Sequence, residues 1–67
     1  MNKAMAIIET PAHKLTAGMS VILPGRKQAV EILMVEDHTN RYVIGHYGKG
    51  FNVSSVAKDQ TVKVIAA

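Results

Sequence analysis

The stretch RYVIGHYGKGFNV, residues 41–53, predicts a β-hairpin. Two runs rich in β-branched and aromatic residues flank a short Gly-Lys-Gly, and such runs favour strands while glycine favours a tight turn between them. All three aromatic residues of the chain, Tyr42, Tyr47 and Phe51, lie within this stretch. Part of a sheet core and a candidate binding surface therefore coincide in one hairpin.

The chain has 67 residues, of which 48% are hydrophobic, and it has no cysteine. A chain of this length forms one domain and buries about 60% of the surface that its unfolded form exposes. We therefore expect a single domain over residues 1–67, stabilised by a small packed core or by oligomerisation rather than by disulfides. The apolar run near the N-terminus ends at Glu9 and is too short for a signal peptide or a membrane helix, so we expect an unprocessed cytoplasmic protein.

Short apolar runs separated by turn residues predict further strands on both sides of the hairpin. The expected strands are residues 4–9, ended by Thr10-Pro11, residues 20–23, ended by Pro24-Gly25, residues 29–36, and residues 61–65. Residues 27–37 also fit a helical pattern of apolar and charged residues, so a helix stays as the alternative there, although the β-branched residues favour a strand. Residues 54–59 are expected to form a single 3₁₀ turn.

Residues 14–22, KLTAGMSVI, are expected to turn Leu15 inward and to bend at Gly18 before entering a strand. This opening, the three-strand meander after it and the short turn before the last strand resemble the SH3-like barrel group. The opening is also similar to that of KOW-type barrels in translation and transcription factors. The resemblance implies an all-β, small SH3-like barrel of five or six strands with a one-turn 3₁₀ helix before the last strand.

The chemically active side chains do not form a recognisable catalytic or metal-binding pattern. The histidines His13, His38 and His46 fall in different segments without paired spacing, and a zinc site needs convergent ligands. Glu36 and Asp37 are adjacent, so on a strand they point to opposite faces and do not form a carboxylate pair. We therefore expect a non-catalytic protein with no metal and no cofactor.

Cationic and aromatic side chains gather around the hairpin and the preceding turn. Small barrels bind single-stranded nucleic acid by stacking bases on exposed aromatic rings while cations neutralise the phosphates. Strict alternation places Tyr42 and Tyr47 on opposite faces, and we expect at least two of the three aromatic residues to fill the core. The candidate residues for binding a nucleic acid or a partner are Arg26, Lys27, Arg41, His46, Tyr47 and Lys49.

A surplus of apolar residues indicates a second surface. On residues 29–36, Val30, Ile32 and Met34 fit one inward face of a strand, and a barrel this small cannot bury a second set as well. The residues expected opposite to the inward set, as a protein interface, are Ile22, Leu33, Val35 and Val43. Because the net charge is only +3, a protein partner or a homodimer is favoured over nucleic acid, with no membrane and no small-molecule substrate expected. The sequence thus predicts a small accessory or modulator protein.

Overall fold

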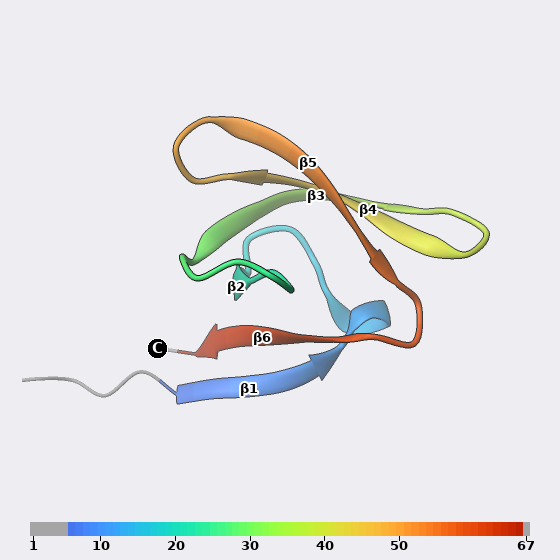
Figure 1. The fold of residues 1–67 in the computed structure, drawn as a ribbon, viewed down its shortest axis with the longest axis horizontal. Coiled ribbons are helices and arrows are strands. Elements are labelled where there is room, and N and C mark those ends of the chain that lie inside the picture. The colour runs from blue at the N-terminus through green and yellow to red at the C-terminus, as the bar shows by residue number, and fades with distance from the viewer. Residues whose placement is uncertain (1–5, 67) are drawn as a thin grey trace, which may run out of the picture.

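The computed structural model describes residues 6–66 as one antiparallel sheet of six strands. The sheet order is β1-β6-β2-β3-β4-β5. In Figure 1 the sheet curls, so that β3, β4 and β5 lie on one side of the molecule and β1 and β6 on the other, with β2 between them. The strands are β1 (Ala6–Pro11), β2 (Ser20–Ile22), β3 (Val30–Asp37), β4 (Arg41–Tyr47), β5 (Phe51–Ala57) and β6 (Thr61–Ala66). The all-β prediction is confirmed.

The hairpin of residues 41–53 is confirmed as β4 and the start of β5. Tyr47 lies directly opposite Phe51, so the turn between the strands consists of Gly48, Lys49 and Gly50. Gly50 has a φ of 145°, which side chains rarely adopt. Gly48 does not have a positive φ, but a Cβ there would lie 3.0 Å from Cγ1 of Val30, so its small size lets the turn approach the start of β3.

Residues 27–37 contain a strand, and the helix alternative is wrong. β3 pairs with β4 along nearly its whole length and, at Val30 and Glu31, with β2 on the other side. A central strand satisfies its backbone hydrogen bonds in these ladders, and the β-branched residues that would crowd a helix pack well on a sheet. The register shifts between Ile32 and Met34, which marks a β-bulge at Leu33.

The core lies on the concave side of the curled sheet. Every strand except β1 contributes to it, as does the connector between β1 and β2. The buried residues are Ala12, Leu15, Val21, Leu23, Ile32, Ile44, Val56 and Val62. The inward position expected for Leu15 is therefore confirmed, whereas Ile7 and Ile8 on β1 are more than half exposed.

Within residues 6–66 the sheet is not closed, because β1 and β5 pair on one side only. The first strand was expected to end at Glu9, before Thr10-Pro11, but β1 includes both of these residues and ends at Pro11, which lies opposite Thr61. Proline is tolerated there because β1 is an edge strand and one side of its backbone needs no ladder partner. Residues 4 and 5 of that expected strand lie outside the described residues.

The 3₁₀ turn expected within residues 54–59 is also wrong. β5 continues to Ala57, and the chain then turns tightly into β6. The backbone N–H of Gln60 donates to the backbone carbonyl of Ala57 at 3.1 Å in this turn. The single 3₁₀ turn in the described chain is Ala12–Lys14, between β1 and β2. Pairing of β5 with β4 along its whole length accounts for the difference, because each added ladder bond extends the strand. No helix in the described part of the chain is long and apolar enough to span a membrane.

The bend expected at Gly18 is confirmed, and it yields a stability prediction. Gly18 has a φ of 96° and its amide donates to the carbonyl of Ile32 at 2.8 Å, while a Cβ would meet nothing within 4 Å. We expect Gly18→Ala to lower the free energy of unfolding by about 1–2 kcal/mol, because only the backbone conformation is strained. Urea unfolding measures the change, and Thr16→Ala in the same loop is the control. An unchanged midpoint for Gly18→Ala would contradict the bend.

Candidate binding surfaces

The β4–β5 hairpin has an inner and an outer face that carry different chemistry. Residues directly opposite each other in an antiparallel ladder share a face. Tyr47 and Phe51 form one such pair, and the next pair along, His46 and Asn52, lies on the other face. His46 is buried and Tyr47 is exposed, so His46 and Asn52 belong to the inner face.

The outer face is apolar and exposed. The exposed fractions are 55% for Tyr47, 56% for Phe51 and 58% for Val53. Gly45, opposite Val53 on β4, leaves room for its neighbours, since a Cβ there would lie 2.7 Å from Met34 Cγ and 3.2 Å from Phe51 Cε1. We define the outer apolar face as the apolar residues that this register brings together, namely Met34, Val43, Tyr47, Phe51 and Val53; Glu31 and Glu36 lie on the same side of the sheet.

The expectation that at least two of the three aromatic residues fill the core is wrong. Tyr42 is partly buried and packs against the core, but Tyr47 and Phe51 are exposed. The inner positions of β4 are taken by Tyr42, Ile44 and His46, and strict alternation then turns Tyr47 outward together with its partner Phe51.

The bulge in β3 corrects the predicted apolar sets. Val35 was expected to point away from the core, but it packs against it, whereas Met34, which was expected inside with Ile32, is 40% exposed. The extra residue at Leu33 shifts the alternation by one, so Ile32 and Val35 both face inward. Of the other three residues predicted for an interface, Leu33 is 44% exposed, while Val43 and Ile22 are half-buried.

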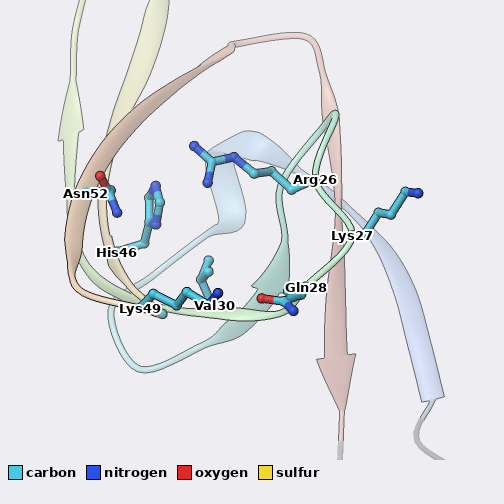
Figure 2. A pocket seen from close by; sticks show the side chains of 8 residues that line it. Arg26, Lys27, Gln28, Val30, His46, Lys49 and Asn52 are labelled. Carbon is cyan, nitrogen blue, oxygen red and sulfur yellow. The ribbon is translucent and has the colours of Figure 1, made fainter.

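A groove of about 490 Å³ lies at the inner side of the hairpin, next to the β2–β3 loop. Three cations line it: Arg26 and Lys27 from the loop, and Lys49 from the hairpin turn. The amides of Gln28 and Asn52 add polar groups, and no carboxylate of residues 6–66 lines the groove. Figure 2 shows Arg26 reaching toward His46, while Lys27 points away. We call this site, with Val30 as an apolar wall, the cationic groove.

Arg26 and His46 meet on one hydroxyl group. The Ser54 Oγ accepts a hydrogen bond from Arg26 Nη2 at 3.5 Å and lies 2.9 Å from His46 Nε2. His46 is 1% exposed, and its Nδ1 has no hydrogen-bond partner in the described chain. Burial, and secondarily the charge of Arg26, lower the pKa of His46 below 6.5. The imidazole is therefore neutral at pH 7.

The groove collects four of the six residues predicted for binding a nucleic acid or a partner. Arg26, Lys27, His46 and Lys49 line it, whereas Arg41 lies at the opposite end of β4 and Tyr47 points to the outer face. Asn52, Gln28 and Ser54 were missed. The hairpin register could have found Asn52, because a three-residue turn places it opposite His46.

The remaining histidines are exposed. His13 lies in the 3₁₀ turn, and His38 follows β3 and contacts Glu36, with Nε2 and Oε1 3.1 Å apart. Within residues 6–66, no three His, Cys, Asp or Glu side chains converge.

Comparisons with protein-family models, with curated proteins and with solved structures give no match to this chain.

Proposed function

We propose that this chain is a small non-catalytic binding module that acts through protein contacts made by its outer apolar face. The observation that carries the proposal is the exposure of Tyr47, Phe51 and Val53 side by side on one sheet face. Water contact with such a patch is unfavourable, and aromatic residues and methionine are enriched at protein interfaces. The curled antiparallel sheet around one core also supports our expectation of an SH3-like fold group.

The charged residues at the two ends of the outer apolar face favour a second copy of this chain as the binding partner. On the outer face, Glu31 lies opposite Tyr47 at one end of β4, and Arg41 lies at the other end. At about 3.3 Å per residue the two ends are roughly 20 Å apart. Face-to-face packing about a two-fold axis, with the strands antiparallel, brings Arg41 of each copy near Glu31 of the other. The apolar residues then pack together between two ion pairs, while Glu36, opposite Val43 on the same face, keeps its contact with His38.

Phe51→Lys is expected to convert a dimer into a monomer, because it buries an unpaired charge at the centre of the contact. Sedimentation velocity over a range of protein concentrations measures the association. The matched control is Ile7→Lys, since Ile7 on β1 is 54% exposed and Phe51 56%. A monomeric wild type would reject self-association, and equal effects of both substitutions would reject this face as the interface.

Single-stranded nucleic acid is the second candidate, because the cationic groove suits phosphates. The exposed rings of Tyr47 and Phe51 lie on the other side of the sheet from the groove. Bases stacked on these rings and phosphates held in the groove would thus require a strand that passes over the Gly48–Gly50 turn. This separation is the reason to place the protein contact first.

A further inference from the structure

The positive charges gathered in the cationic groove are not balanced by carboxylates of the described chain. Within the described chain, the only contacts between basic side chains and carboxylates are those of His38 with Glu36 and of Lys58 with Asp37. Arg26, Lys27 and Lys49 therefore have no carboxylate partner there. Like charges gathered on two separate segments repel one another, so an anion in the groove would stabilise the arrangement.

We propose that the cationic groove binds a phosphate ester, with the phosphate between Arg26 and Lys49 and the attached organic group against Val30. This site is independent of the outer apolar face. An Arg guanidinium matches phosphate oxygens with a planar set of donors, and Lys adds a mobile point charge. The side-chain amides of Gln28 and Asn52 supply further donors at the same groove.

The size of the groove argues for an ester rather than a bare ion. Its volume of about 490 Å³ falls within the range of about 300–1,000 Å³ typical of small-molecule sites. The lining divides accordingly, because the cations can hold the charged end while Val30 offers an apolar surface to the remainder. A nucleotide has both parts, and so does each unit of a single-stranded nucleic acid.

Arg26 lines the cationic groove and reaches toward His46 (Figure 2). Its Nη2 makes a long hydrogen bond of 3.5 Å to Ser54 Oγ, which is also in contact with His46 Nε2, so one nitrogen of the guanidinium is weakly held. The structure shows no other hydrogen bond of this side chain within residues 6–66. The remaining guanidinium N–H groups are thus free to donate to a ligand.

Buried His46 gives a readout specific to this site. Its ladder neighbours Ile32 and Asn52 are uncharged, so Arg26 provides the nearby charge, while Lys27 and Lys49 line the same groove. A bound phosphate favours the imidazolium and raises the pKa of His46, and by linkage binding tightens as the pH falls. Ligands elsewhere on the surface would leave this pKa unchanged.

The test is an NMR titration of the full chain with adenosine 5′-monophosphate and, separately, with adenosine. We expect the monophosphate to shift the amide signals of the groove in a saturable way and to raise the pKa of His46, and adenosine to do neither. Equal shifts with both ligands, or no binding of phosphate-bearing ligands at millimolar concentration, would overturn the proposal. So would an unchanged His46 pKa in the bound state.

Variants separate the groove from general attraction to a positive protein. We expect Arg26→Gln and Lys49→Gln each to weaken binding about tenfold, as expected for a lost charged hydrogen bond. Lys49 is exposed in a turn, so Lys49→Gln tests the site without disturbing the fold. Lys14→Gln removes an exposed charge outside the groove and is expected to leave affinity unchanged. An equal loss with Lys14→Gln would overturn the site.

A thymidine oligonucleotide without a terminal phosphate distinguishes the two sources of the ester. If it binds more tightly than the monophosphate and its affinity falls with salt by a slope of about 0.7 per phosphate contact, the ligand is single-stranded nucleic acid. Tighter binding of the monophosphate identifies a free nucleotide or a similar metabolite. Either result supports the phosphate site, provided that Lys49→Gln weakens the binding of that ligand.

Discussion

Ile44→Ala is expected to lower the free energy of unfolding by about 2–5 kcal/mol, because it leaves a cavity in a core that cannot collapse around it. Ile44 is fully buried at the middle of β4, between Val35 on β3 and Ser54 on β5. A domain of this size is stable by roughly 3–10 kcal/mol in total. The substitution therefore removes a large share of the stability.

Urea unfolding followed by circular dichroism measures this loss. The matched control is Ile8→Ala, which deletes the same atoms from a side chain that is 52% exposed on the edge strand β1. We expect the control to cost less than about 1 kcal/mol, since little apolar surface returns to water. Similar costs at the two positions would mean that the core does not lie where the structure places it.

Acidification is expected to destabilise the protein through His46. Burial and the charge of Arg26 lower the pKa of His46 in the folded state, whereas the unfolded chain has a value near 6.5. Below pH 6.5 the unfolded state therefore binds more protons than the folded state, and stability decreases as the pH falls towards the folded pKa. Above pH 6.5 the imidazole is neutral in both states, and the stability that is lost on acidification is fully present. Each unit of difference between the two pKa values corresponds to about 1.4 kcal/mol.

His46→Gln isolates this effect, because glutamine can still hydrogen-bond to Ser54 but does not titrate. The quantity to compare is the difference in unfolding free energy between about pH 7.5 and pH 5, since carboxylates contribute to the pH dependence of both proteins. We expect a smaller difference in the variant. His13→Gln, at an exposed histidine, controls for the substitution. If His46→Gln retains the full difference, the acid sensitivity has another origin.

Local sequence was sufficient where one segment decides its own structure. The Gly-Lys-Gly turn fixed the hairpin register, and that register alone places His46 opposite Asn52. Pro24-Gly25 stops β2 as expected, and Gly25 has a φ of 78°. The strand expected over residues 61–65 is confirmed as part of β6. These features depend on turn geometry and on a period of two residues, both of which can be read along the chain.

Predictions from the sequence were wrong where pairing with a neighbouring strand decides which way a side chain points or where a strand ends. Because of the bulge at Leu33, Val35 points inward and Met34 outward, the reverse of what was expected. The bulge depends on how β3 aligns with β4 and not on the sequence of β3 alone. The first strand continues past its expected end at Glu9 to Pro11, because pairing with β6, about 50 residues later in the chain, sets where it ends. The groove likewise needs the Arg26 loop to lie over the hairpin.

The sequence by itself determined an all-β chain, its central hairpin and the basic residues near it. Each of these follows from residue type and from spacing over a few neighbouring positions. Only the tertiary structure decided that Tyr47 and Phe51 face solvent on one side of the sheet while Arg26, His46 and Lys49 meet on the other. The physical reason is that side-chain facing depends on strand pairing and loop placement, which are set by contacts between segments distant in the chain.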